Sequence, residues 1–370
     1  MQALQWACMG RQTLLLNWVY YHQVGHAIEA FKVAKGLANA NPGVEVHVLL
    51  NARTPVELSR ACDWIAAAYP IDLDEIVLNG IPRVWDYIVN DHRVTTSPFA
   101  FSPPLRAFHD LAATHFEARL WRGGQHELPT NGPPFYQRNA PIRMRVPDSA
   151  RVWVESLDLA PVNIAVLPAG SSPEPIYPSL SWWRRALSEL GREFPGARFF
   201  LTGKSAPDDK TSTLVFPADA MKELAALPQV ENCVDIGLWN QLALLERCDM
   251  LIAPHTGFAF LAPSVGTPWL AVSGARWPEC FFNGVPFYCV LPECTEYPCW
   301  TTMKPECTGR FEAGRQVECM DDSLTGRVPD LVRGTRLLLR KDFTFDEAWN
   351  LYQARIDELG LARERFFEIS

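Results

Sequence analysis

Short apolar runs and longer amphipathic segments alternate along the first part of the chain. The run at residues 13–21 is bounded by polar residues, which is typical of a buried strand, and residues 22–26 read as a loop. Residues 27–40 carry apolar side chains at helical spacing until the Asn-Pro-Gly turn at 41–43, and residues 44–50 (VEVHVLL) alternate like a strand. The next expected elements are a helix that begins at Thr54 and Pro55 and a third strand at residues 76–78. Strand, helix and strand in close succession predict a parallel sheet with crossover helices.

The same alternation starts again in the second half, after an irregular stretch. Residues 81–147 are rich in His, Pro, Arg and aromatic residues without a regular period, so we expect helices broken by loops there. The second series of expected strands is residues 162–167, 197–201, 234–236, 250–253 and 268–273. The helices expected between and after them are residues 180–194, 221–227, 238–248, 258–265 and 345–367. The restart predicts a second parallel sheet and therefore a second domain.

This organisation predicts an α/β protein with two doubly wound, Rossmann-like domains that face each other across a cleft, followed by a C-terminal helix. The expected limits are residues 1–155 for the first domain, 156–342 for the second and 343–370 for the helix. In open α/β sheets, ligands bind at the carboxyl ends of the strands. The informative loops are therefore those that follow strands, at residues 21–26, 168–177, 203–204, 255–257 and 274–283.

Bulk composition narrows the class of protein. Of the 370 residues 48% are hydrophobic, which is enough for two cores. The formal charge is -8 and there is no dense run of Lys or Arg, so we expect no nucleic-acid partner. No apolar stretch approaches the roughly 18 residues that span a bilayer, and the first residues do not resemble a signal peptide. We therefore expect a cytoplasmic enzyme without a transmembrane segment.

Two glycine-containing loops could hold a phosphate at one edge of the second sheet. Thr256 and Gly257 lie between a strand and a helix, where glycine lets the backbone approach a ligand and free N–H groups attract an anion. Residues 170–172 follow the first strand of that domain and offer the same chemistry. A tight turn explains either loop alone, but two at one edge favour a diphosphate site. Lys204 and Arg276 each follow an expected strand and are either phosphate cations or, as is more common, solvated surface charges. The candidate residues are Gly170, Ser171, Ser172, Lys204, His255, Thr256, Gly257 and Arg276.

Residues 255–268 resemble a known signature. Their sequence, HTGFAFLAPSVGTP, is similar to the Asp-Thr-Gly-Leu-x-His-Leu-Ala-x-x-x-Gly-x-Pro signature of glycosyltransferase family 9. This is the ADP-heptose:lipopolysaccharide heptosyltransferase family, which has a GT-B fold. Further segments resemble family motifs in the same order, namely residues 166–171 (VLPAGS), Tyr177-Pro178 with Trp182, residues 200–203 (FLTG), residues 273–278 (SGARWP) and residues 24–28 (VGHAI). The resemblance covers most of the C-terminal half and about the first 50 residues.

Several positions depart from the family pattern. His26 stands where the family has the Asp taken as its catalytic base, and His255 stands where the signature has Asp. Phe260 replaces the signature His, and Pro175 and Ile176 occupy the place of a phosphate-binding Lys. The resemblance therefore implies the fold and the reaction class, whereas the donor nucleotide and sugar stay open.

His26 is the candidate catalytic base for an acceptor hydroxyl. Histidine is the commonest general base near neutral pH, and other GT-B enzymes place a histidine in this loop. A helix-start histidine with a structural hydrogen bond is the alternative of equal weight. His22 is a weaker competitor, and with Gly25 it makes up the expected acceptor side. Residues 72–74 (DLD) fit a surface turn better than a metal-binding motif, and since GT-B enzymes generally need no metal at the reaction centre, we expect no catalytic metal.

Six of the ten cysteines fall within residues 280–320. Four of them, Cys294, Cys299, Cys307 and Cys319, resemble a cysteine set that some members of the family carry in this place. Four thiolates in one long loop could hold a structural zinc or iron ion. Loose buried thiols are the alternative.

We therefore expect an inverting glycosyltransferase that moves a heptose or another hexose-like sugar from a nucleotide-sugar donor to an acceptor hydroxyl. The acceptor is left open among a glycolipid, a protein and a small metabolite. Two alternatives remain. One is a nucleotide-sugar epimerase of the same architecture, which would need paired carboxylates, and the other is a non-catalytic protein that binds sugar nucleotides.

Overall fold

A computed structural model describes most of the chain. The described residues are 11–19, 22–79, 84–90, 121–122, 125–126, 135–137, 140–205, 216–279, 283–299, 303–321 and 326–366. They belong to two compact units, Met1–Ile142 and Arg143–Ser370, and each is described by itself. None of the helices in the described ranges combines the length and the apolar surface that crossing a bilayer requires.

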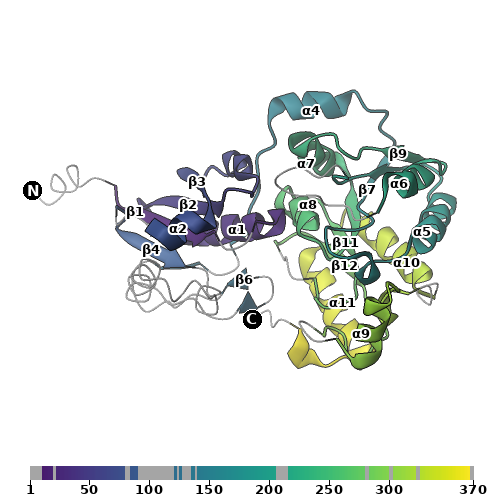
Figure 1. The fold of residues 1–370 in the computed structure, drawn as a ribbon. Helices are drawn as coiled ribbons and strands as arrows, with labels where there is room; N and C mark the ends of the chain where they lie inside the picture. The colour runs from purple at the N-terminus through teal and green to yellow at the C-terminus, as the bar shows by residue number, and fades with distance from the viewer. Residues whose placement is uncertain are drawn as a thin grey trace, which may run out of the picture. The chain divides into compact units, whose positions relative to one another are not determined.

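The first unit is built on a parallel four-stranded sheet, drawn in purple and blue in Figure 1. Its strands are β1 (Thr13–Trp18), β2 (Glu45–Asn51), β3 (Ala67–Ile71) and β4 (Tyr87–Asn90), in the spatial order β3-β2-β1-β4. The other elements are α1 (Val24–Ala40), the 3-10 helix η3 (Val56–Ala61), α2 (Leu73–Asn79) and an antiparallel ribbon of β5 (Trp121–Arg122) and β6 (Gln125–His126). The expected start of strand, helix and strand is confirmed by β1, α1 and β2.

The third strand lies earlier in the chain than its pattern indicated. Residues 76–78, expected as a strand, belong to α2, so that prediction is wrong. The strand that pairs with β2 is β3, in which Tyr69 and Pro70 obscure the apolar alternation. Because β3 is an edge strand, one of its sides makes no ladder hydrogen bonds, and a proline without an N–H is tolerated there.

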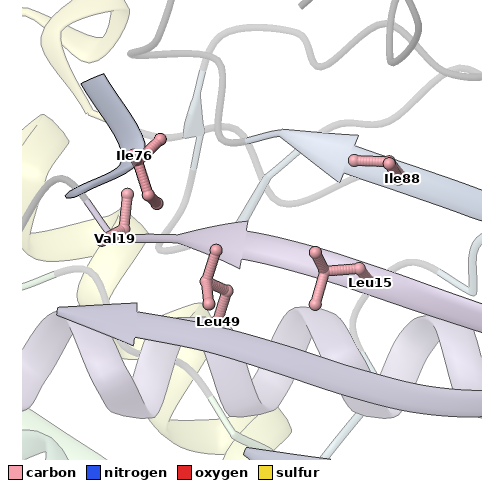
Figure 2. Close-up of a cluster of buried hydrophobic side chains, with 5 residues drawn as sticks. All are labelled: Leu15, Val19, Leu49, Ile76 and Ile88. Atoms are coloured by element: carbon pink, nitrogen blue, oxygen red, sulfur yellow. The ribbon is translucent and has the colours of Figure 1, made fainter. Parts of the chain in front are cut away.

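A compact apolar cluster holds α2 against the sheet (Figure 2). Leu15 and Leu49 come from β1 and β2, Ile88 comes from β4, Ile76 comes from α2, and Val19 follows the end of β1. All five side chains are at most 4% exposed. Burial stabilises by about 25 cal/mol for each Å² of apolar surface. This cluster therefore holds the end of β1, from which the chain passes to α1.

The second unit contains a six-stranded parallel sheet in the order β12-β11-β10-β7-β8-β9. Its strands are β7 (Val162–Val166), β8 (Ala197–Leu201), β9 (Val230–Asn232), β10 (Met250–Pro254), β11 (Trp269–Val272) and β12 (Phe287–Val290). Its helical elements are α4 (Asp148–Glu155), η6 (Glu174–Ile176), α5 (Leu180–Glu193), α6 (Ala218–Ala225), α7 (Leu238–Arg247), η7 (Gly257–Phe260), α8 (Leu261–Ser264), α9 (Pro305–Glu312), η8 (Glu318–Met320), α10 (Val328–Leu338), α11 (Phe345–Glu358) and η10 (Arg363–Arg365). The expected strands at 162–167, 197–201, 250–253 and 268–273 agree with β7, β8, β10 and β11.

Two further elements differ from their sequence-based limits. The strand expected at residues 234–236 is wrong, because β9 ends at Asn232 and Asp235 adopts a left-handed backbone with φ 63°, which no strand accommodates. The helix expected at residues 345–367 is shorter than predicted. Helix α11 ends at Glu358, and Gly360 follows with φ 64°. A glycine in this conformation just after a helix is a common helix stop.

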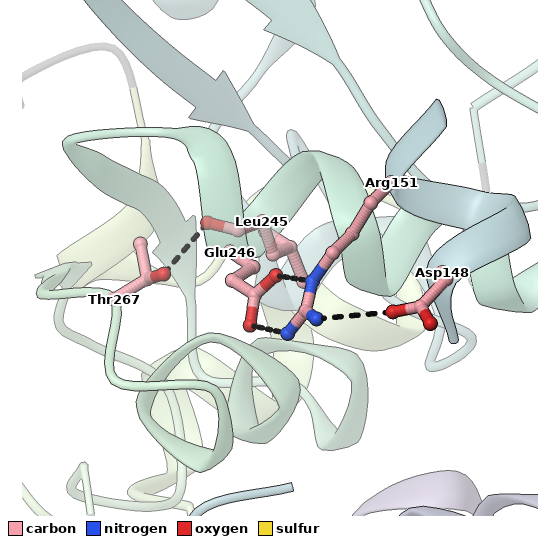
Figure 3. A network of polar contacts seen from close by, with 5 residues as sticks. All are labelled: Asp148, Arg151, Leu245, Glu246 and Thr267. Carbon is pink, nitrogen blue, oxygen red and sulfur yellow. Dashed lines mark hydrogen bonds and ion pairs between the residues drawn. The ribbon is translucent and has the colours of Figure 1, made fainter. Parts of the chain in front are cut away.

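Helix α4 packs against α7 of the second unit. Nε and one terminal nitrogen of Arg151 lie 2.8 and 2.9 Å from the two carboxylate oxygens of Glu246, and Arg151 also contacts Asp148 (Figure 3). In the same view Thr267 donates its hydroxyl to the carbonyl of Leu245 at 2.6 Å. The boundary between the compact units therefore precedes α4, whereas we expected the domain boundary to follow it. The residue limits of the domains stay a prediction.

The strand order creates a switch point in each sheet. In the second unit the chain runs outward from β7 to β9, returns to β10 on the other side of β7, and continues outward to β12. Val166 of β7 pairs with Ile252 of β10, so the loops that follow these two strands lie side by side. In the first unit β1 and β4 have the same relation. The expected class, two Rossmann-like α/β sheets, is confirmed, and its switch points are where such sheets bind ligands.

Candidate functional site

The loops after β7 and β10 contact each other at the switch point. A Cβ atom built on Gly170 would lie 3.0 Å from Cβ of Thr256 and 2.5 Å from the hydroxyl oxygen of Tyr177. Real Cβ atoms do not approach other heavy atoms so closely, so this position admits only glycine without a shift of its neighbours. The two loops that the sequence singled out as phosphate-binding are thus brought together by the sheet.

The loop after β7 is held from behind by the start of α5. The hydroxyl of Tyr177 accepts the N–H of Ser172 at 3.2 Å, and burial raises the pKa of this phenol. The indole N–H of Trp183 donates to the carbonyl of Pro168 at 2.9 Å. Ser171 is exposed at the tip of the loop. These contacts present residues 170–172 at the sheet edge in one conformation.

The loop after β10 begins with His255 and continues into a tight helical turn. Thr256 is 6% exposed, and its hydroxyl oxygen accepts the N–H of Ala259 at 3.3 Å, so it acts as the cap of η7. The helix expected at residues 258–265 is therefore a 3-10 turn that begins at Gly257 and passes into the short α8. The side chain of Thr256 therefore caps η7 with its hydroxyl and also lies beside Gly170 in the loop after β7.

An aromatic group lies behind this loop. The ring of His255 is 5.8 Å from the ring of Phe260 and 6.1 Å from that of Trp277, centroid to centroid. The guanidinium of Arg276 lies 5.9 Å from the ring of Trp277 and 5.7 Å from that of Phe311. His255 and Arg276 are both half-buried, so the structure stacks them among aromatic rings at the sheet edge.

Lys204 follows β8, directly after Gly203, whose φ of 121° turns the chain at the sheet edge. Gln241 of α7 bonds both the N–H and the carbonyl of Gly203, at 3.4 and 3.0 Å, and so fixes this turn. The strands β11, β10, β7 and β8 are consecutive in the parallel sheet. The structure therefore assembles all the predicted donor-side residues at one edge.

In the first unit, the candidate base lies at the start of a helix. Helix α1 begins at Val24, so Gly25 and His26 belong to its first turn, and the loop expected at residues 22–26 is shorter than predicted. Nδ1 of His26 is 2.8 Å from Oε2 of Glu29. His22 precedes the helix, and burial, then the charge of Arg53 and then that of His26 lower its pKa. The residues of the acceptor side thus share the carboxyl end of β1.

The four late cysteines converge on one cavity. Cys294, Cys299, Cys307 and Cys319 all line it. Burial and the neighbouring Cys307 and Cys294 raise the pKa of Cys299, and burial raises the pKa of Cys319 to about 12. Among the residues that the structure describes, no group of three or more His, Cys, Asp or Glu side chains is arranged as a formed metal site. Cysteine thiolates are ligands that zinc and iron prefer, and the four cysteines line one cavity.

Comparison with known proteins finds solved structures with a similar fold. No protein-family model matches the chain, and no curated protein matches it. Among solved structures, the chain is similar to E. coli ADP-heptose lps heptosyltransferase II, with 14% identity and a TM-score of 0.53, over 89% of this chain and 98% of the other. It is also similar to the glycosyl transferase family 9 protein from Veillonella parvula DSM 2008, with 11% identity and a TM-score of 0.52, over 90% and 98%.

The chain has the fold of these heptosyltransferase-like glycosyltransferases. Within that fold, two residues of the candidate site were not found from the sequence. Tyr177, which was noted only as part of a motif, supports the glycine loop, and no local signal shows that contact. Glu29 stands three residues after His26, a spacing that places two side chains on one helix face, but the sequence pattern put His26 in a loop before the expected helix.

Proposed function

We propose that this protein is an inverting glycosyltransferase that transfers a heptose or another hexose-like sugar from a nucleotide-sugar donor to an acceptor hydroxyl. The observation that carries the proposal is the contact between Gly170 and Thr256 at the switch point of the second sheet. Switch points of open parallel sheets bind ligands, and glycine at position 170 lets the two loops pack closely, so that backbone N–H groups of both can meet a diphosphate there. The likeness to heptosyltransferase II and the family 9 protein supports a transferase.

On the donor side, the leaving group is a nucleoside diphosphate, whose charge must be stabilised as the glycosidic bond breaks. The exposed Ser171, the half-buried Ser172 and the backbone beside Gly170 belong to the loop that follows β7 at the switch point. Lys204 follows β8, which lies beside β7, and Arg276 follows β11, which lies beside β10; both supply positive charge. We assign these residues, with His255, Thr256 and Gly257, to the donor diphosphate and nucleotide.

On the acceptor side, a base must accept the proton of the attacking hydroxyl. We assign this role to His26, with Gly25 and His22 beside it at the end of β1. The side chain of His26 is 28% exposed, so it is open to a substrate. Its Nδ1 contacts the carboxylate of Glu29 on the same helix. A histidine can accept a proton near neutral pH as the departing group leaves.

The donor is tested by thermal shift across ADP-, GDP-, UDP- and dTDP-sugars. A ligand that binds only the native state at 100 times its dissociation constant stabilises it by about 2.7 kcal/mol. We expect one nucleotide class to raise the melting temperature, and slow release of nucleoside diphosphate from that donor. His26→Ala should abolish the release and keep the thermal shift. If no sugar nucleotide shifts the melting temperature, both the transferase and the binding-protein hypotheses fail. A shift without turnover would favour the binding protein.

The epimerase alternative is not favoured. The candidate donor-side residues are glycines, hydroxyls, a histidine and cations, whereas the epimerase would need paired carboxylates. If incubation with the bound donor yields an epimer that is still attached to its nucleotide, the transferase assignment is wrong.

We also propose that the cysteines around the shared cavity hold a structural zinc or iron ion. The four residues are Cys294, Cys299, Cys307 and Cys319. A bound cation would deprotonate thiols whose pKa burial now raises, and would pin a long loop. Metal analysis of purified protein should find close to one ion per chain, and less in Cys307→Ser. Buried Cys62 of the first unit, changed to serine, is the matched control and should leave the metal content unchanged. A metal-free, fully folded protein would refute the proposal.

A further inference from the structure

The contact between His26 and Glu29 has the geometry of a base and its orienting group. Glu29 follows His26 by three residues on α1, and the carboxylate oxygen is 2.8 Å from Nδ1 of the imidazole. The glutamate side chain is only 5% exposed, whereas the histidine side chain is 28% exposed. One end of the imidazole is therefore held by a buried group while the ring itself stays accessible.

The chemistry of the two groups decides which nitrogen carries the proton. An ionised carboxylate can only accept hydrogen bonds, so a neutral imidazole that bonds to it must carry its proton on Nδ1. The other nitrogen, Nε2, is then unprotonated and can accept a proton from a substrate. The partner of one ring nitrogen thus sets the chemical role of the other.

The position of the pair in the fold points to a reason for this arrangement. His26 is in the first helical turn after β1, and β1 lies beside β4 at the switch point of the first sheet. The half-buried His22 lies within electrostatic range of His26, because burial, then the charge of Arg53 and then that of His26 lower the pKa of His22. A buried carboxylate in contact with His26 counters the positive charge that the imidazole acquires on taking a proton.

We propose that Glu29 is a positioning residue that holds His26 with its proton on Nδ1, so that Nε2 faces the acceptor hydroxyl as the base. The inference rests on the proposed function. In the step, the acceptor O–H bond breaks and its proton moves to Nε2. The acceptor oxygen forms a bond to the anomeric carbon of the sugar, and the bond from that carbon to the diphosphate oxygen breaks. The nucleoside diphosphate leaves with the electron pair, and the imidazolium, stabilised by Glu29, later releases its proton to water.

The first test is the tautomer of His26, read from the ¹⁵N shifts of its ring nitrogens in histidine-labelled protein. The chain has eight histidines, and the signals lost in His26→Asn assign the pair. We expect the wild type to hold the proton on Nδ1, and Glu29→Met, whose side chain has no oxygen to accept the hydrogen bond, to shift His26 toward the other tautomer. Glu29→Asp should restore part of the wild-type signal. The exposed Glu75, changed to glutamine, is the control in the same unit and should change nothing.

The second test is turnover of whichever donor the thermal-shift screen identifies. We expect Glu29→Met to lower kcat by about a hundredfold, within the range that general-base catalysis contributes, and to leave KM for the donor unchanged. Glu29→Asp should recover part of the loss. Melting curves of both variants confirm that they fold.

The outcomes separate this inference from the function on which it rests. An unchanged tautomer in a folded Glu29→Met overturns the positioning role, whatever the activity. A changed tautomer with wild-type kcat also overturns it, since His26 would then not be the base. If the wild type turns over no donor, the proposed function fails, and the tautomer measurement alone decides whether Glu29 orients His26.

Discussion

The thiol sulfur of Cys319 accepts a hydrogen bond from the backbone N–H of Ala275 at 2.9 Å. The thiol of Cys299 donates to the carbonyl of the same residue at 3.5 Å. Ala275 has a left-handed backbone with φ 60°, and a Cβ atom on the preceding Gly274 would lie 2.5 Å from Cε of Met320. Residues around the cysteine cavity therefore hold the loop after β11 through these contacts, and that loop carries Arg276.

Substitutions at Ala275 should show how the left-handed backbone of this loop affects the free energy of unfolding. A left-handed non-glycine residue costs about 1–3 kcal/mol, and a β-branched side chain is worse still. We expect Ala275→Val to lower the free energy of unfolding by about 2 kcal/mol, and Ala275→Gly to cause little or no loss because it relieves the backbone. Denaturant titration measures both. Equal destabilisation by the two variants would show that packing of the methyl group, and not the backbone, dominates.

Loss of the sulfur at position 319 should loosen the loop after β11, which carries the donor-side candidate Arg276. We expect Cys319→Ala to cost about 1 kcal/mol, the net value of one intramolecular hydrogen bond, and to weaken donor binding several-fold. Cys294→Ala provides a matched comparison, because Cys294 lines the same cavity. If a bound metal is what holds the loop, both variants should lose affinity together. If the hydrogen bond to Ala275 holds it, only Cys319→Ala should.

Gly170→Ala should damage the donor site directly. The new methyl group would meet the hydroxyl of Tyr177 at 2.5 Å and the side chain of Thr256 at 3.0 Å, so the loop must shift. Overpacking of this kind costs about 1–3 kcal/mol, and a displaced binding loop should weaken donor binding about tenfold or more. Gly196→Ala is the control, because no atom lies within 4 Å of its Cβ position. Calorimetric titration with the donor compares the two variants, and equal affinities would remove residue 170 from the site.

Tyr177→Phe tests the support behind the same loop. It removes the acceptor of the Ser172 N–H, which should cost about 1 kcal/mol and weaken donor binding. It also removes the atom that crowds a side chain at position 170 most closely. The double variant with Gly170→Ala should therefore bind the donor better than the two single losses predict. Strict additivity in a double-mutant cycle would contradict the contact.

Lys32 should make the first unit sensitive to pH. Its side chain is 4% exposed, and burial lowers its pKa from 10.5 to about 7. Between these values the unfolded chain keeps a proton that the folded chain has lost, so stability should rise as the pH rises from about 7 to about 10. A difference of one in pKa between the folded and the unfolded chain corresponds to about 1.4 kcal/mol of stability. We expect Lys32→Met to flatten the pH dependence of the urea midpoint, and the half-buried Lys35, changed to Met, to leave it unchanged. A wild-type slope retained in Lys32→Met would show that other groups cause it.

Local pattern was enough for much of the fold. The strands β7, β8, β10 and β11 are apolar runs bounded by turn residues, and α5 is bounded by the Ser179 cap and a Pro-Gly turn. Burial on both faces of a parallel sheet makes such strands apolar throughout, so their sequences reveal them. The hydrophobic pattern mislocated the outermost strands β3 and β9, each of which has a neighbouring strand on one side only. The edge strand β3 carries a tyrosine and a proline, and the edge strand β9 is only three residues long.

The sequence by itself therefore determined the α/β class, the restart in the second half and which loops carry glycine, hydroxyl and histidine chemistry. Tertiary structure alone decided that β10 returns beside β7, which brings Gly170 to Thr256, and that Cys319 reaches Ala275. It also decided that the Glu29 carboxylate, one turn from His26, bonds to it from a buried position. The physical reason is that strand order and burial depend on contacts between residues far apart in the chain. Hydrophobic period and turn chemistry, in contrast, depend on neighbours.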